Sequence, residues 1–215
     1  MAGVSMTGYL VLGILSARDT SAYEIVEQMS KGVAEVWHRA DRQLYDAPKR
    51  LVELGLITAR KETSAGRRQR TVYSITPAGR TALTSWIESP IQPSAMEFEG
   101  LVRVLFADQG DVDALRATLR AVAEQARIRR DLFISHAKYA ITSGGGTFPE
   151  SAHVFAIVNR YMVKHFNLMI QWAEWALEQV ENWPDSATPA TTHHDQTWQI
   201  FRESARMTRN PKRRL

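Results

Sequence analysis

The stretch RQLYDAPKRLVELGLI, residues 42–57, decides how the first part of this chain folds. Its apolar residues recur at the spacing of one helix face, at Leu44, Ala47, Leu51 and Leu54. Asp41 suits the start of this helix and Gly55 its end. Arginine, glutamine, tyrosine and lysine stand between the apolar residues. The pattern therefore predicts a helix with one face in a core and the other turned toward a partner.

Two helices are expected before this stretch. Apolar residues between positions 9 and 15 predict a first buried helix, closed by a turn at 17–21. Ser21 and Glu24 have the spacing of a capping box, which opens a second helix. The apolar face of that helix is expected to consist of Tyr23, Ile25, Val26 and Met29.

After residue 55 the pattern changes to that of strands. Residues 56–61 and 71–75 are rich in β-branched and aromatic side chains, and the segment between them holds a glycine and several basic residues. Thr76 and Pro77 then suit the N-cap and first position of another helix, on which Leu83, Trp86 and Ile87 form an apolar side. Two short strands with a basic tip are therefore predicted, followed by a helix that ends before the prolines near residue 90.

Helix, helix, helix, hairpin and helix is the order of a winged helix-turn-helix. The third helix of such a fold enters the DNA major groove by its N-terminal side chains. Arginine, glutamine and tyrosine there can contact base edges, whereas other basic residues suit phosphates. The DNA-contacting residues expected on this basis are Arg42, Gln43 and Tyr45 for the groove, and Lys49, Arg50, Arg67, Arg68 and Arg70 for the backbone.

Positive charge gathers in the same segment. Residues 39–70 hold nine lysines or arginines against four acids, a net charge of +5. Residues 91–201 hold nine basic residues against thirteen acids, and residues 202–214 return to +5. A local positive field favours a polyanion such as double-stranded DNA, although a solvated basic surface has the same composition. The tail near the C-terminus could add phosphate contacts or simply continue a short docking helix built on Trp198 and Phe201.

Three groups of residues resemble the PadR-type transcriptional regulators. They are Tyr9-Leu-Val-Leu-Gly-Ile-Leu15 with Tyr23-Glu-Ile25; Leu44-Tyr45 with Lys49-Arg50-Leu51 and Gly55-Leu-Ile57; and Gly66-Arg67 with Tyr73-Ser-Ile-Thr76 and Gly79-Arg80. The resemblance implies a homodimeric repressor with an N-terminal winged helix and a C-terminal helical dimerisation domain. It also implies binding to a palindromic operator and release by a small aromatic or drug-like effector.

The sequence departs from the family pattern at three positions. Ala22 stands where the family commonly has glycine, and Asp46 and Pro48 replace the usual proline and leucine after Leu44-Tyr45. A proline inside a helix removes a backbone hydrogen bond and costs about 3 kcal/mol. Either Asp46 caps a shortened helix, or residues 42–46 form a separate turn.

The rest of the chain is predicted to be helical. Helices are expected at 96–107, 111–140 and 150–181, the last two separated by a loop with glycines at 144–146. On the last helix an a/d seam is expected at Phe155, Val158, Met162, His165, Met169, Trp172 and Ala176. The same helix carries an aromatic and methionine stripe that could bind an effector, although such stripes more often form a core or an interface. The candidate effector-binding residues are Tyr161, His165, Phe166, Met169, Trp172 and Trp175.

No catalytic constellation is found. The chain has no cysteine, and therefore neither a thiolate nucleophile nor a zinc site built from sulfur. His193, His194 and Asp195 are consecutive, without the spacing of metal ligands on a helix, and the glycines at 144–146 lack the context of a phosphate-binding loop. We therefore expect no enzyme, no cofactor and no metal.

Taken together, the sequence predicts a mainly α protein with a small β-hairpin wing. Residues 1–90 are expected to bind DNA, residues 95–183 to dimerise and respond to a small hydrophobic ligand, and residues 184–215 to form a linker and basic tail. A cytoplasmic location without a membrane span is expected, since the uncharged run at 7–17 is too short to cross a bilayer. The alternative is a winged-helix protein-interaction module that does not bind DNA specifically.

Overall fold

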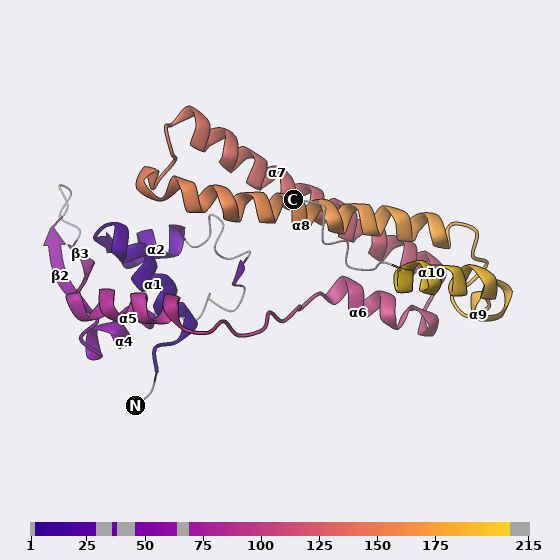
Figure 1. Ribbon diagram of the computed structural model, residues 1–215, viewed down its shortest axis with the longest axis horizontal. Helices are drawn as coiled ribbons and strands as arrows, with labels where there is room; N and C mark the ends of the chain where they lie inside the picture. The colour runs from indigo at the N-terminus through magenta and orange to yellow at the C-terminus, as the bar shows by residue number, and fades with distance from the viewer. Residues whose placement is uncertain (1–2, 29–35, 38–45, 64–68, 207–215) are drawn as a thin grey trace. The chain divides into compact units, whose positions relative to one another are not determined.

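The computed structural model divides the chain into two compact units, Met1–Ser94 and Ala95–Leu215, which we describe separately (Figure 1). The described residues are 3–28, 36–37, 46–63 and 69–206.

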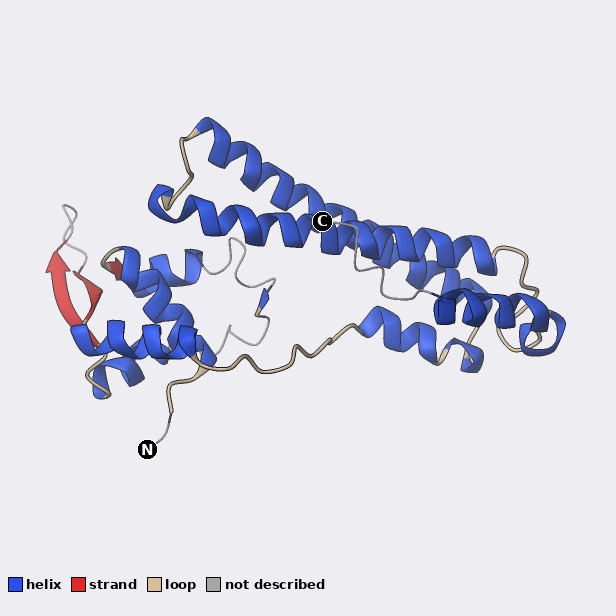
Figure 2. Cartoon of the chain, in the orientation of Figure 1, coloured by secondary structure: helices blue, strands red, loops and turns tan. Residues whose placement is uncertain are grey.

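The first unit consists of short helices around a small antiparallel sheet (Figure 2). Its elements are α1 (Met6–Ala17), β1 (Thr20–Ser21), α2 (Ala22–Gln28), α4 (Ala47–Glu53), β2 (Ile57–Thr63), β3 (Gln69–Ile75) and α5 (Pro77–Glu88). The strand order is β1-β3-β2, and β3 pairs with β2 from Gln69 opposite Thr63 to Ile75 opposite Ile57. The predicted hairpin is confirmed, but Thr20 and Ser21, which we expected in a turn, add a third strand beside β3.

Local capping explains where two of these helices begin. The backbone N–H of Ser21 donates to Glu24 Oε2 at 2.8 Å, and the N–H of Glu24 faces Ser21 Oγ at 3.4 Å, which confirms the capping box. The hydroxyl of Thr76 accepts from the N–H of Gly79 at 3.1 Å, with Pro77 at the first position of α5. Each contact satisfies a backbone donor that the first helical turn leaves without an intrahelical partner.

The helix of the deciding stretch, α4, is shorter than the leucine pattern predicted. Asp46 is its N-cap residue, and Pro48 lies in the first turn, where a missing N–H breaks no helical bond. Its end is a Schellman motif, in which the N–H of Leu56 donates to Leu51 O and that of Gly55 (φ 70°) to Val52 O. Of the predicted face, Ala47 and Leu51 are buried but Leu54 is 37% exposed, because it lies beyond the last turn. Asp41 and Leu44 lie outside the described residues.

The core of the first unit joins the helices to the sheet. Its fully buried large side chains include Leu12 and Leu15 of α1, Ile25 of α2, Leu51 of α4 and Ile57 of β2. Burial of one such aliphatic side chain stabilises a fold by about 1.5–3 kcal/mol. Two residues expected on apolar faces, Tyr23 and Ile87, are instead 75% and 67% exposed.

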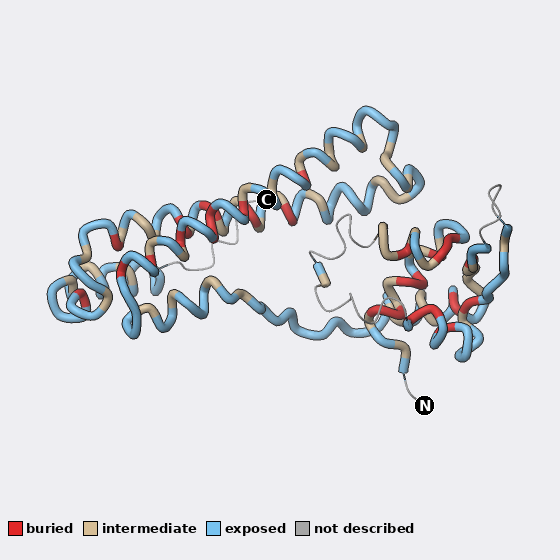
Figure 3. The backbone as a smooth tube through the Cα atoms, turned by 180° about the vertical axis from the view of Figure 1, so that it is seen from behind, coloured by how far each residue is buried: buried red, intermediate tan, exposed pale blue. Residues whose placement is uncertain are grey.

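All secondary-structure elements among the described residues of the second unit are helices. Its elements are α6 (Glu99–Leu105), η3 (Ala107–Gln109), α7 (Val112–Thr142), η4 (Pro149–Ser151), α8 (Ala152–Val180), α9 (Pro189–Thr192) and α10 (His194–Arg206). Buried residues recur along α7 and α8, whereas α6 has none (Figure 3). Helices α7 and α8 confirm the expected helices at 111–140 and 150–181, whereas the helix expected at 96–107 is shorter, because α6 begins at Glu99 and ends at Leu105.

The long helices α7 and α8 pack as an antiparallel pair. Leu119 and Val180 belong to one buried cluster, Ala123 and Ala173 belong to another, and the tilted rings of Phe133 and Phe166 have their centroids 5.9 Å apart. Of the predicted seam on α8, Met162 is buried within the single chain, while Phe155 and Val158 are 49% and 46% exposed. The buried stripe consists of Met162, Phe166, Ile170, Ala173 and Val180. Its steps of four, four, three and seven residues keep these side chains on the face that meets α7.

The end of α8 is held by one arginine. Arg116 of α7 donates to the backbone carbonyl oxygens of Val180, Glu181 and Trp183 at 3.1, 2.8 and 2.9 Å. Beyond this point the composition predicted a linker, but α9 and the start of α10 occupy part of it. None of the helices among the described residues is long and apolar enough to span a membrane.

Candidate nucleic-acid interface

The outer face of α4 carries the expected basic residues. Leu51 is buried in the core, while the side chains of Lys49 and Arg50 are 73% and 55% exposed. Lys49 Nζ lies 3.5 Å from Asp46 and Arg50 lies 2.8 Å from Glu53, both as pairs within the helix. Isolated exposed pairs of this kind, which are not part of a larger charge network, contribute less than about 1 kcal/mol, so either side chain can exchange its carboxylate for a phosphate at little cost.

The residues proposed for base and wing-tip contacts are Arg42, Gln43, Tyr45, Arg67 and Arg68, and all five lie outside the described residues. Of the wing residues, Arg70 is described. It is the second residue of β3 and stands opposite Glu62 of β2. The predicted DNA-contacting residues that the structure places are therefore Lys49 and Arg50 on one helix and Arg70 on the sheet.

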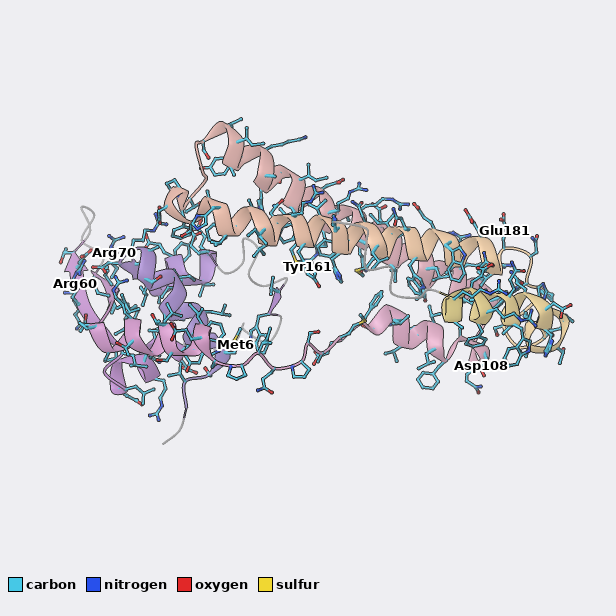
Figure 4. All side chains as sticks on the ribbon, viewed as in Figure 1. Met6, Arg60, Arg70, Asp108, Tyr161 and Glu181 are labelled. Carbon is cyan, nitrogen blue, oxygen red and sulfur yellow. The ribbon has the colours of Figure 1, made fainter. Side chains whose placement is uncertain are left out.

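Arg70 belongs to a charge network on the sheet that the sequence did not reveal. Its guanidinium lies 3.3 Å from Glu62 and 3.8 Å from Glu24 of α2. The neighbouring Arg60 of β2 lies 2.9 Å from Glu62 and 2.7 Å from Asp19, and it also donates to Ser74 Oγ (Figure 4). Because β3 lies between β2 and β1, Arg60 reaches across the central strand to the residue that precedes β1. Two guanidinium groups thus face three carboxylates.

Hydrogen bonds keep these carboxylates ionised. The Ser74 hydroxyl and then Arg60 lower the pKa of Asp19, and the backbone N–H of Ser21 lowers the pKa of Glu24. Arg60 is also the main group that lowers the pKa of Glu62. Each bond stabilises the charged form of its carboxyl group, so the network holds its full charge at neutral pH.

Acidification is expected to weaken the first unit through these groups. A lowered pKa in the folded state contributes stability that is present above the ordinary carboxyl pKa of about 4 and is lost as the pH falls through the lowered value. Glu24→Gln should therefore unfold at a lower urea concentration than the unmodified protein at pH 7, and the difference should shrink at pH 3. Urea titrations followed by circular dichroism measure both midpoints. An equal difference at the two pH values would show that the charge of Glu24 is not the cause.

The six expected effector-binding residues differ in burial and in their neighbours. Phe166 is buried in the α7–α8 core, while Tyr161 and Trp175 are 65% and 41% exposed. Tyr161 stacks on His165 at 5.9 Å, and Trp172 meets Phe98 edge-on at 6.1 Å. Met169 packs partly buried against the core. The stripe is thus divided between core and surface.

An apolar hollow of about 450 Å³ lies instead on α6 and the residues that precede it. It is lined by Met96, Phe98, Leu101, Val102, Val104 and Leu105. Their apolar character was visible in the sequence, but a helix pattern alone does not distinguish a buried face from an unpartnered one. Among the described residues, no group of three or more histidine or acidic side chains has an arrangement that could hold a metal ion.

Two family models match this chain. Residues 11–85 match the transcriptional regulator PadR-like family, and residues 99–181 match the C-terminal region of virulence activator alpha. The first segment is therefore a PadR-like domain, as the sequence motifs predicted. Both models describe regulators, which agrees with the expectation that the chain is not an enzyme.

The similarity extends to individual proteins. The negative transcriptional regulator PadR of Bacillus subtilis is 26% identical over 100 residues, which are 46% of this chain and 54% of PadR. The chain spans about half the length of the curated relatives it matches. The solved structure of smu.1604c from Streptococcus mutans has a TM-score of 0.69 at 21% identity and covers 80% of this chain and 98% of its own.

Structures of B. subtilis PadR with operator DNA and with p-coumaric acid have TM-scores of 0.68 and 0.64, both at 17% identity. They cover 82% and 83% of this chain and 99% and 100% of the PadR chains. At such identities the likeness shows the fold, which is that of a PadR-like winged helix with a C-terminal helical domain.

Proposed function

We propose that this protein is a DNA-binding transcriptional regulator that represses genes in the cytoplasm by binding a palindromic operator as a homodimer. The observation that carries the proposal is the PadR-like domain at residues 11–85, in which α4 buries Leu51 and exposes Lys49 and Arg50. A PadR of this fold has been solved with operator DNA. Residues 1–90 would bind DNA, and the helices at 95–183 would dimerise.

The exposed face of α6 supports the homodimer. Leu101, Val102, Leu105 and Phe106 are 40–71% exposed, and the hollow beside them is lined by apolar side chains. A contiguous exposed apolar surface on a folded unit marks an association site, and twofold homodimers are the commonest assemblies. A second copy of the chain would bury this face and provide the twofold symmetry that a palindromic operator requires.

Release by a small aromatic or hydrophobic effector is the second part of the proposal. B. subtilis PadR has been solved with p-coumaric acid. In this chain the half-exposed aromatic residues of α8, among them Tyr161 and Trp175, offer stacking surfaces for a ring. Two recognition helices must stand about 34 Å apart to enter successive major grooves. An effector that changed this spacing would therefore remove one half-site contact, which couples its binding to DNA release.

One observation favours activation instead of repression. Residues 99–181 match the C-terminal region of virulence activator alpha, so the helical unit resembles that of an activator. The sign of regulation depends on where the operator lies relative to the promoter, which the DNA-binding unit does not determine. A protein-interaction module without specific DNA binding is the remaining alternative.

Fluorescence-anisotropy titration of the purified protein against its own promoter and a scrambled duplex, at two salt concentrations, tests the proposal. We expect tighter binding to the promoter, and its release on addition of a phenolic acid would identify the effector class. Equal and strongly salt-dependent binding to both duplexes would mean that the basic surface binds DNA only by sequence-independent electrostatic attraction. No binding to either duplex would favour the interaction module.

Arg67→Ala and Gln43→Ala are expected to weaken DNA binding in different ways. Arg67, between the two predicted strands, should contact phosphate. Its loss should therefore lower the affinity for all duplexes alike and flatten the salt dependence by about one unit of slope. Gln43 should read a base, so its loss should relax the choice at particular operator positions by about 1–3 kcal/mol. Titrations against single-base operator variants distinguish the two. Identical behaviour of both variants would place Gln43 outside the groove.

A further inference from the structure

The side chain of Glu62 joins the two arginines at the base of the wing. It stands opposite Arg70 in the β2–β3 register, accepts from Arg60 Nε at 2.9 Å, and lies 3.3 Å from the Arg70 guanidinium. Its side chain is 35% exposed, against 54% for Arg60 and 51% for Arg70. Glu62 is therefore the one carboxylate among the described residues that contacts both guanidinium groups.

The other partners of the two arginines are not equivalent. Arg60 has Asp19 at 2.7 Å and the Ser74 hydroxyl at 3.1 Å in addition to Glu62. Among the described residues, Arg70 has only Glu24 besides Glu62: its Nη1 lies 3.8 Å from Oε1 of Glu24, while Oε2 of the same carboxylate accepts three bonds from Thr20 and Ser21. Loss of the Glu62 charge would thus leave Arg60 anchored and Arg70 weakly held.

We propose that Glu62 is a positioning residue that holds Arg70 on the sheet and thereby keeps the base of the wing from binding DNA phosphates. The inference rests on the proposed DNA-binding function, and it changes the expected role of Arg70, whose phosphate contact forms only when Glu62 is uncharged. Arg70 is the second residue of β3 and its side chain is half-exposed, so its guanidinium needs only a side-chain rotation to leave the sheet. A carboxylate and a phosphate compete for the same guanidinium fork. Since phosphate contacts carry no sequence information, the restraint lowers sequence-independent affinity and leaves base selection to the recognition helix.

Glu62→Gln tests this role because glutamine keeps the shape of the side chain and removes its charge. Titrations against promoter and scrambled duplexes over a series of KCl concentrations give the slope of log affinity against log salt. We expect the slope to steepen by about 0.9, the value for one added phosphate contact, and both affinities to rise roughly fivefold near 0.1 M salt. The ratio between the two duplexes should stay unchanged.

Two further variants separate the release of Arg70 from a simple loss of negative charge. Glu88→Gln removes the same charge from an exposed position at the end of α5 and should leave the slope as it is. Glu62→Gln combined with Arg70→Ala should return the slope to that of the unmodified protein. Arg70→Ala alone should change the slope by much less than one unit. This test remains valid even when the Glu62 variant does not fold.

Three outcomes would overturn the inference. The first is a salt slope of Glu62→Gln equal to that of the unmodified protein. The second is an equal steepening of the salt slope in Glu62→Gln and Glu88→Gln. The third is a salt slope that flattens by about 0.9 in Arg70→Ala alone. The proposed function fails separately, when the unmodified protein does not prefer its promoter, and the slopes on the scrambled duplex then still decide the role of Glu62. Failure of the unmodified protein to bind any duplex would overturn both.

Discussion

Replacing Gly79 with alanine is expected to destabilise the first unit by roughly 3 kcal/mol, the upper part of the range for overpacked sites. A Cβ atom at this position would stand 2.1 Å from the carbonyl oxygen of Leu56 and 2.9 Å from Ile75 Cγ1. A side chain could rotate away, but a backbone carbonyl cannot. The Leu56 oxygen also accepts from the N–H and the hydroxyl of Thr76, so moving it disturbs the N-cap of α5.

Gly13→Ala is the matched control for this prediction. Gly13 also lies within a helix, α1, but it is exposed, and a Cβ there would meet no atom within 4 Å. Alanine has the higher helix propensity, so this variant should be more stable by roughly 0.5–1 kcal/mol. Urea unfolding followed by circular dichroism measures both changes. If Gly79→Ala were as stable as Gly13→Ala, the result would contradict the close approach of Gly79 to the Leu56 carbonyl oxygen.

Replacing Leu105 with glutamate is expected to produce a monomer that binds the promoter at least roughly a hundredfold more weakly. Leu105 is 71% exposed on α6 and lines the apolar hollow, so the substitution should spare the fold of the single chain. In the proposed homodimer it would bury a charge in an apolar interface. A monomer contacts only one half-site. It therefore loses the gain in affinity, about 10²–10⁴-fold, that linkage to a second site provides.

Size-exclusion chromatography with light scattering measures the assembly, and anisotropy measures the affinity for the promoter. Leu105→Met is the control, because methionine keeps an apolar side chain of similar volume and should leave a dimer that binds normally. A Leu105→Glu protein that remained dimeric would place the interface elsewhere. A monomer that bound the promoter with unchanged affinity would contradict the need for two half-sites.

The order of the elements could be predicted from the sequence because the signals that set it are local. The capping box of Ser21 and Glu24, and Thr76 with Pro77, each act over three residues or fewer, and both are confirmed. The period of apolar residues likewise placed α7 and α8. The family motifs within residues 9–80 follow from the same local constraints, and the match at 11–85 confirms them.

The tertiary structure decided which polar and apolar surfaces meet. Arg60 and Asp19 are 41 residues apart in the chain, and their pairing depends on β1 joining the sheet beside β3. A strand of two residues is too short to give a recognisable sequence pattern. Gly79 likewise depends on a tertiary contact, because the carbonyl oxygen of Leu56 leaves no room for a side chain there. Which stripe of α8 faces α7 also depended on how the two helices pack. Sequence periodicity reports that a face is apolar, but burial is a property of the surface that comes to lie against it.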